Sequence, residues 1–238
     1  MAKRGAKKHT KRITTPKAVP IHDKKAFTWI LGTSPGPHPV NYSISLGVLL
    51  RDVMKIARTA KEVKKILSSR LVTVDGKVRA SEKFPIGLMD VVSIPKDDKH
   101  YKVSIDGLGR LGLYSVQKSD TLTKLARVIK KHVIRAGKIN LTFHDGRNLI
   151  ADNHVMVGDS VVLSLPDGKM KSHLNRKSGS KCLILHGKHV GSIVELKEII
   201  ERKGGKPSEA LVTGDSGEFV TVAKYLFVID DTFGKVNE

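Results

Sequence analysis

The chain has 238 residues, with 43 lysines and arginines against 23 aspartates and glutamates, and a formal net charge of +20. Hydrophobic residues make up 39% of it, enough for one large domain or two to three small ones. A net charge of this size opposes compactness, so it indicates a polyanionic partner, either nucleic acid or an anionic membrane.

A membrane partner fits the sequence poorly. No segment approaches the roughly 18 consecutive apolar residues of a spanning helix, and the charged first fifteen residues lack the apolar stretch of a signal peptide. The single Cys182 has no partner for an internal disulfide or a zinc knuckle. We therefore expect a cytoplasmic protein with no membrane association, no metal and no other cofactor.

The positive charge is concentrated in the first three quarters of the chain. Residues 1–40 carry 9 basic residues and one acid, residues 41–95 carry 10 and 5, residues 96–180 carry 16 and 8, and residues 181–238 carry 8 and 9. The last quarter therefore has no electrostatic reason to face the polyanion.

Residues 1–42 form a basic N-terminal extension. Its first forty residues show almost no apolar periodicity, and TSPGPHPV at 33–40 holds three prolines, which favour an extended path. We interpret the extension as a segment that orders on binding RNA; a nuclear-type address signal or an unstructured leader is the alternative. The cations expected on phosphate here are Lys3, Arg4, Lys7, Lys8, Lys11 and Arg12.

Residues 43–105 predict a small module that begins with an amphipathic helix. Lys55 and Arg58 fall within about 40° of Arg51 on a helical wheel, opposite a face of leucine, valine, isoleucine and alanine. A solvated face normally mixes positive and negative charges, but residues 41–95 hold twice as many cations as acids. The pattern favours an RNA-binding face over the alternative, an ordinary solvated helix.

A second helix and a hairpin complete the module. Thr59 and Glu62 form a Thr-x-x-Glu capping box that starts the helix. Leu71–Val74 predicts a strand, and Asp75-Gly76 predicts the tight turn to its return strand. The cations of the module expected on RNA phosphates are Arg51, Lys55, Arg58, Lys61, Lys65, Arg70, Lys77 and Arg79.

Residues 96–170 predict a central β-rich domain with one helix, and the boundary of this domain overlaps the end of the module. Alternating apolar residues predict several strands. Asp120–Ala136 predicts the helix, with Gly137 as its C-terminal stop. One face of this helix would form a second cationic stripe, which either contacts phosphate or is simply solvated. The stripe consists of Lys124, Arg127, Lys131 and Arg135.

Residues 171–238 predict a small β-barrel. Glycine-rich turns separate four short apolar segments, the last of which is broken near Ala223, and strands at this spacing are typical of such a barrel. The strands are expected at Cys182–Leu185, Ser192–Leu196, Ala210–Thr213 and Phe219–Ile229.

Two motifs suggest chemistry that their surroundings do not support. The glycines at 107, 109 and 112 match the dinucleotide fingerprint, but that fingerprint needs a helix after it, and residues 111–116 continue as a strand. His186 and His189 have no cysteine or carboxylate at metal-ligand spacing. The sequence also lacks a nucleophile elbow, a Walker loop and an HExxH helix, so we expect no enzymatic activity.

Residues 45–94 resemble the RNA-binding module named after bacterial ribosomal protein four, most clearly in VTVDGKV at 72–78. That module also occurs in pseudouridine synthases and tyrosyl-tRNA synthetases, so by itself it implies RNA binding without a specific role. The whole chain resembles the archaeal–eukaryotic family of small-subunit ribosomal protein four. The strings that carry this resemblance are RGAKKHTKR at 4–12, GPHPV at 36–40, LRD at 50–52, VDGKVR at 74–79, FPIGLMDVVSIPK at 84–96, HDGR at 144–147 and FVTVAKYLFVID at 219–230.

The resemblance implies an α+β, multi-domain chain: the helix–helix–hairpin module, the central β-rich domain, and a C-terminal Src-homology-three-like barrel with a KOW motif. It implies a structural constituent of the small ribosomal subunit that binds small-subunit rRNA beside neighbouring small-subunit proteins, and not a homo-oligomer. The KOW turn departs from the family pattern of Gly-Arg-Asn-x-Gly, because Lys188 and His189 stand between Gly187 and Gly191. The glycines that shape the turn remain, while the polar side chains differ.

Two other functions would use the same features. An RNA-modifying enzyme would dock through the module, but it needs a catalytic domain with a concentrated site, and residues 96–238 show none. A KOW-bearing transcription factor would co-purify with RNA polymerase rather than with ribosomal subunits.

Overall fold

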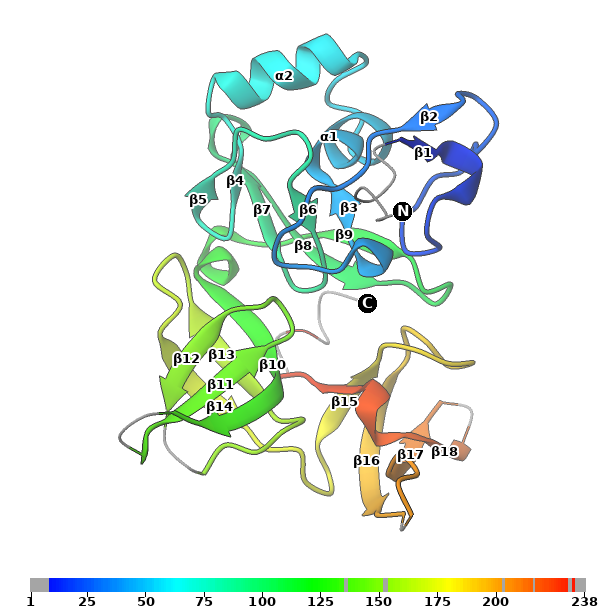
Figure 1. Cartoon of the computed structure of the whole chain (residues 1–238), viewed down its shortest axis with the longest axis vertical. Helices are drawn as coiled ribbons and strands as arrows, with labels where there is room; N and C mark the ends of the chain where they lie inside the picture. The colour runs from blue at the N-terminus through cyan, green and yellow to red at the C-terminus, as the bar shows by residue number, and fades with distance from the viewer. Residues whose placement is uncertain are drawn as a thin grey trace, which may run out of the picture.

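A computed structural model of the chain describes residues 9–134, 137–151, 154–202, 204–215, 217–230 and 233. Three five-stranded antiparallel sheets dominate these residues, which contain few helices. One sheet lies below the helices in the upper part of Figure 1, and the other two lie side by side beneath it. No helix in the described part of the chain is long and apolar enough to cross a membrane.

The upper sheet belongs to the module and runs in the order β5-β4-β7-β8-β9. The predicted hairpin turn is confirmed, because Asp75 and Gly76 have φ angles of 52° and 73°, as a type I′ turn requires. The glycine-rich segment at 107–112 connects two strands of this sheet, as predicted. The strands are β4 (Thr73–Val74), β5 (Lys77–Val78), β7 (Val91–Ile94), β8 (Lys99–Ile105) and β9 (Leu111–Ser115).

The first helix of the module is shorter than predicted. Helix α1 (Leu46–Val48) continues as a π-helix over Leu49–Val53 and then ends. Lys55 has a φ of 54°, which no right-handed helix accommodates. Lys55 and Arg58 therefore follow the helix instead of forming a stripe with Arg51 along it.

The second helix, α2 (Ala60–Ser68), begins as predicted. The Thr59 hydroxyl accepts a hydrogen bond from the Glu62 backbone N–H at 3.3 Å, and the Glu62 carboxylate accepts one from the Thr59 N–H at 3.4 Å. Val63 and Leu67 bury the inner face of the helix. The short strands β3 (Ile44–Ser45) and β6 (Pro85–Ile86) pair beneath the helices.

The described part of the extension packs against the module. Strand β1 (Thr10–Lys11) pairs with β2 (Trp29–Ile30), and Ala18, Val19 and Ile21 are buried in the core that the module helices also fill. This corrects the expectation of a segment without a core, because a few aperiodic apolar residues suffice when a neighbour supplies the rest. Residues 1–8, and with them Lys3, Arg4, Lys7 and Lys8, lie outside the described residues.

The central sheet contradicts the helix predicted at 120–136. Strand β10 (Thr123–Val133) occupies this segment and pairs on one edge with β11 (Ile139–Phe143) and on the other with β13 (Ser160–Ser164). Pairing on both edges outweighs the helical spacing of its apolar residues. The sheet is completed by β12 (Asn148–Ala151) and β14 (Met170–Leu174). Arg135 lies outside the described residues.

The C-terminal sheet confirms the four predicted strand segments. Its order is β18-β17-β16-β15-β19, and the predicted break near Ala223 is a 3-10 turn at Ala223–Tyr225. The strands enclose an apolar cluster that includes Cys182. They are β15 (Lys181–Ile184), β16 (Ile193–Ile200), β17 (Glu209–Gly214), β18 (Gly217–Val222) and β19 (Leu226–Val228).

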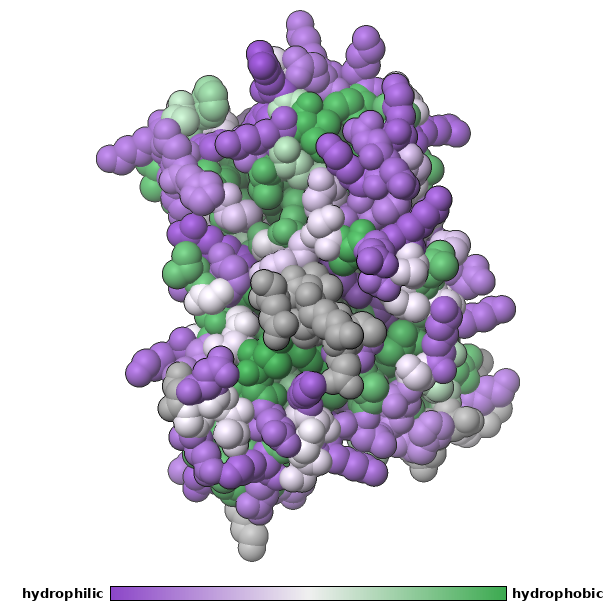
Figure 2. Space-filling view, turned by 180° about the vertical axis from the view of Figure 1, so that it is seen from behind, coloured by the Kyte–Doolittle hydropathy of each residue, from purple (hydrophilic) through white to green (hydrophobic). Residues whose placement is uncertain are grey.

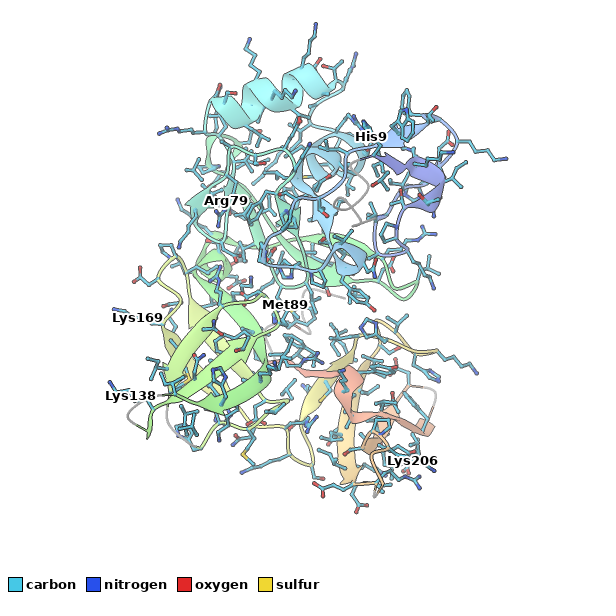
Figure 3. The ribbon with its side chains drawn as sticks, in the orientation of Figure 1. His9, Arg79, Met89, Lys138, Lys169 and Lys206 are labelled. Atoms are coloured by element: carbon cyan, nitrogen blue, oxygen red, sulfur yellow. The ribbon has the colours of Figure 1, made fainter. Side chains whose placement is uncertain are left out.

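A shared apolar cluster joins the three sheets. It brings Met89 of the module together with Leu125 of the central sheet and Phe227 of the C-terminal sheet. Figure 3 shows Met89 between the upper and lower parts of the molecule. The Arg127 guanidinium also donates hydrogen bonds to the carbonyl oxygens of Lys224 and Leu226, at 2.8 and 3.1 Å. The sheets therefore form one packed body.

Candidate nucleic-acid interface

A groove of about 840 Å³ lies between the extension and the helical end of the module. Two aromatic side chains from the extension line it, Phe27 and Trp29, which are 65% and 54% exposed. Arg51, Lys55 and Arg58 line it from the module. The short first helix is responsible for this arrangement, because the chain turns away from the helix axis after residue 54 and carries Lys55 and Arg58 along the groove.

The groove has a positive electrostatic balance. The Arg51 guanidinium donates hydrogen bonds of 2.9 and 3.3 Å to the Asp52 carboxylate, and an Arg12 nitrogen lies 3.7 Å from it. Two guanidinium groups thus neutralise the acid that lines the groove. Lys55 and Arg58 are both exposed, so their charges are available to an anionic ligand.

Helix α2 presents a second cationic face next to the groove. Lys61 and Lys65 are exposed on it, and Arg70 follows its end with a φ of 56°. Figure 2 shows hydrophilic side chains projecting from this end of the molecule, and Figure 3 shows them pointing away from α2. The backbone N–H of Arg58, above all, holds the pKa of Glu62 below its usual range, so this carboxylate stays ionised at the start of the helix.

Arg12 lies inside the protein, which corrects its prediction as a surface contact. It is buried, its Nε donates a 2.7 Å hydrogen bond to the Asp23 carbonyl, and its guanidinium carbon lies 5.7 Å from the Phe27 ring centroid. Arg12 therefore contacts two residues that line the groove, Phe27 and Asp52, without being exposed in it. Lys11, next to it on β1, is exposed as expected.

The hairpin exposes less surface to RNA than predicted, because its turn packs against the central sheet. Asp75 is buried, and a Cβ placed on Gly76 would lie 3.1 Å from the side chain of Pro166. Lys77 remains exposed, whereas the Arg79 guanidinium lies 4.4 Å from the ring centroid of Phe84 and is half-buried. The hairpin therefore contributes the Lys77 cation and a partly covered Arg79.

The turn is docked by Lys124, whose expected place was an exposed helical stripe. Its Nζ lies 2.8 Å from Asp75, 2.5 Å from Asp90 and 3.1 Å from Asp145, and the side chain is almost fully buried. Burial alone would lower the pKa of Lys124, but the three carboxylates together raise it above its usual range. The Lys124 cluster, meaning this lysine and its three aspartates, therefore stabilises the fold and is inaccessible to phosphate.

His38 and Arg147 extend the Lys124 cluster. The His38 Nε2 lies 3.0 Å from both carboxylate oxygens of Asp90, and an Arg147 nitrogen donates a 2.5 Å hydrogen bond to Asp75. Burial would raise the pKa of Asp90, but Lys124 and His38 hold it below its usual range. The cluster thus joins the extension, the module and the central sheet.

The predicted KOW turn lies between β15 and β16. Gly187 and Gly191 have positive φ angles of 103° and 82°, and Lys188 is exposed between them. A Cβ on Gly191 would lie 2.5 Å from the Asp106 carbonyl oxygen of the upper sheet, so this glycine permits a close contact between two sheets. No group of three or more potential metal-binding side chains occurs within the described ranges.

Phe27 and Trp29 are functional candidates that the sequence-based prediction missed. Aromatic residues are only 5% of the chain, and Trp29 is its only tryptophan. An aromatic pair inside a strongly basic segment is a signal for single-stranded nucleic acid. This signal could be interpreted only with the structure, because the cations that line the same groove come from a different part of the chain.

Comparisons with known proteins identify the family. The family model "Ribosomal family S4e" matches residues 97–170, and the "RS4NT (NUC023) domain" matches residues 4–41. The chain is 39% identical to small ribosomal subunit protein eS4 of Methanosphaera stadtmanae, with 96% of this chain and 95% of that protein covered. It is 38% identical to the eS4 protein of Methanocaldococcus jannaschii, with 97% of each covered.

A solved structure agrees with these matches. The crystal structure of the 30S ribosomal protein S4e from Thermoplasma acidophilum superposes with a TM-score of 0.69 at 33% sequence identity, covering 81% of this chain and 97% of that one. Each of these relatives is named as a ribosomal protein. The chain belongs to the S4e family of ribosomal proteins.

Proposed function

We propose that this protein is a structural constituent of the small ribosomal subunit in the cytoplasm, where it binds small-subunit rRNA beside neighbouring small-subunit proteins. The observation that carries the proposal is the continuous cationic surface formed by the groove and α2, on a chain of net charge +20. Its relatives are named as small-subunit ribosomal proteins, which supports the same role.

The binding mechanism is the neutralisation of phosphates at fixed positions. Lys55 and Arg58 in the groove and Lys61 and Lys65 on α2 are exposed and come from consecutive segments, so they can follow one stretch of RNA backbone. Such contacts fix the position of a protein without reading sequence. Specificity then comes from the shape of the folded RNA and from its unpaired bases.

The domain organisation supports this division of labour. We propose that the extension (1–42) and the module (43–105) form the RNA-binding end. The expected central domain (96–170) contains β8 and β9 of the module sheet as well as most of the central sheet. The central sheet, against which the hairpin turn docks, runs from β10 to β14 over residues 123–174. The proposed Src-homology-three-like barrel, expected at 171–238, begins only after β14, because Met170–Leu174 pairs with β13 of the central sheet. The meander of β15 to β18, with β19 beside β15, supports this barrel and its KOW turn at Gly187–Gly191.

A salt titration tests the RNA-binding surface directly. The variant Lys55→Ala/Arg58→Ala should bind a small-subunit rRNA fragment more weakly and with a flatter salt dependence, because each lost phosphate contact removes about 0.7–0.9 from the slope of log K against log salt. The matched control is Lys169→Ala/Lys206→Ala, which removes the same charge from exposed positions of the central and C-terminal sheets, as labelled in Figure 3.

An unchanged slope for the groove variant, or an equal loss in both variants, would refute a specific role for this surface. Sedimentation of a native lysate with mass spectrometry of each fraction tests the assembly itself. The protein should peak with the small ribosomal subunit, and its absence from that peak would refute the proposed function.

A further inference from the structure

The groove exposes two large aromatic side chains that the fold does not need there. Phe27 and Trp29 are 65% and 54% exposed, yet only 5% of the chain is aromatic and the three sheets have apolar cores of their own. Exposed apolar side chains that gather at one place are a feature of binding sites. Three cations line the same groove, so the ligand that fits combines a flat apolar surface with negative charge.

Both rings are held in position by the extension. Trp29 is paired with Lys11 across β1 and β2, and the His9 ring lies 5.7 Å from its indole. Arg12 supports the Phe27 ring and is fixed by the carbonyl of Asp23. These contacts restrict the two rings, which reduces the side-chain freedom that binding would remove.

We infer that this groove binds an unpaired RNA nucleotide, whose base stacks on Trp29 and whose phosphates contact Lys55 and Arg58. Aromatic side chains stack on the bases of single-stranded RNA, and cations beside them track its backbone. Paired bases in a helix are already stacked on their neighbours, so the site selects a loop, a bulge or a strand end. The inference rests on the proposed RNA-binding function and adds the state of the bound nucleotide.

The single tryptophan makes the site directly observable, because all tryptophan fluorescence of the full chain comes from Trp29. Three ligands separate stacking from charge: single-stranded octa-adenylate, an abasic ribose-phosphate chain of the same length, and a base-paired RNA duplex. Octa-adenylate should quench the fluorescence strongly. The abasic chain and the duplex should leave it nearly unchanged, since neither offers a free base.

Variants test the same contact by affinity, measured with dye-labelled octa-adenylate. Trp29→Ala should weaken binding roughly 5- to 150-fold, the range that stacking of one base accounts for. Trp29→Phe should retain most of the affinity because it keeps an aromatic face. The matched control is Tyr42→Ala, which truncates an aromatic side chain of similar exposure, 50%, outside the groove.

The outcomes distinguish this inference from the function on which it rests. Equal quenching by the abasic chain, or wild-type affinity in Trp29→Ala with weakened binding in Lys55→Ala/Arg58→Ala, overturns stacking and leaves the RNA-binding surface in place. If neither octa-adenylate nor the small-subunit rRNA fragment binds to the wild-type protein, the proposed function and this inference both fail.

Discussion

The ammonium group of Lys124 lies 2.8 Å from a carboxylate oxygen of Asp75, although 49 residues separate the two in the chain. Asp75 belongs to the turn of the module hairpin, and Lys124 to β10 of the central sheet. Asp90 and Asp145 complete the surroundings of the ammonium group. The pair therefore attaches the module to the rest of the protein.

Replacing Lys124 tests this attachment. Lys124→Met should lower the free energy of unfolding by about 3–5 kcal/mol, because it removes the ammonium group that three buried carboxylates share and leaves only Arg147 and His38 beside them. Urea denaturation measures the effect. Lys130→Met is the control, since Lys130 lies on the same strand but is exposed, and it should stay within about 0.5 kcal/mol of wild type. Similar losses in both variants would contradict the structural role.

We expect the free energy of unfolding to fall in mildly acidic solution because of the buried His144 ring. Its Nδ1 accepts a hydrogen bond from the Arg127 N–H at 3.2 Å, and its Nε2 lies 3.1 Å from the Leu88 carbonyl oxygen, so the neutral ring satisfies both neighbours. Burial, with the nearby Lys124 charge, lowers the pKa of His144 from 6.5 to about 4. Between pH 4 and pH 6.5 the unfolded chain binds more protons at His144 than the folded protein does. The contribution of neutral His144 to the free energy of unfolding is therefore complete above pH 6.5 and is lost as the pH falls towards 4.

The expected loss from His144 between pH 7 and pH 5 is about 2 kcal/mol, measured as the free energy of unfolding in urea. His144→Gln should be less stable at pH 7 and should lose less on acidification. His22→Gln, at an exposed position, should keep the full pH dependence. The same acid sensitivity in wild type and His144→Gln would assign the effect to other groups.

Two glycines of the predicted KOW turn, Gly187 and Gly191, should differ in their tolerance of a side chain. Both have positive φ angles, so alanine at either position costs about 1 kcal/mol or more in backbone strain. Gly191→Ala should cost a further 1–3 kcal/mol or so, because its Cβ would lie 2.5 Å from the Asp106 carbonyl oxygen, whereas nothing lies within 4 Å of a Cβ on Gly187. Thermal denaturation compares them, and equal melting temperatures would argue against the contact between the two sheets.

The buried Cys182 thiol can report whether the core of the C-terminal sheet opens to solvent. It lies in the core of the C-terminal sheet, and burial raises the pKa of its thiol to about 12, so very little thiolate forms near pH 8. A disulfide reagent such as dithionitrobenzoate should label the folded protein very slowly and the urea-unfolded protein at once. Rapid, stoichiometric labelling of the folded protein would contradict this burial.

The sequence was sufficient where the structure follows local rules. The capping box of Thr59 and Glu62 and the positive φ angles of Asp75-Gly76 depend on a few neighbouring residues, and both predictions are confirmed. The strands of the C-terminal sheet are equally local, because glycine turns separate short apolar segments. The family resemblance was also correct.

The errors occur where distant segments decide the structure. The apolar residues of 122–133 do have helical spacing, but the segment forms a strand because it pairs with a neighbouring strand on each edge. Lys124 is buried only because carboxylates from three other segments surround it. The sequence did not predict the groove for the same reason, since Trp29 and Lys55 line one groove only when the extension packs against the module.

Several strings that carry the family resemblance meet at the Lys124 cluster. GPHPV contributes His38, VDGKVR contributes Asp75, FPIGLMDVVSIPK contributes Asp90, and HDGR contributes Asp145. The most recognisable parts of this sequence therefore hold the sheets together. The candidate RNA contacts lie on exposed residues around the helices, where the fold imposes fewer constraints.

The packing of residues 9–42 against the module sets the order of events in complex formation. Because Ala18, Val19 and Ile21 already lie in the core and β1 already pairs with β2, the groove exists before any RNA arrives. Its conformational entropy is lost during folding of the protein and not during the encounter. On the proposed RNA-binding function, we therefore expect the rate of complex formation to follow the folding of the RNA.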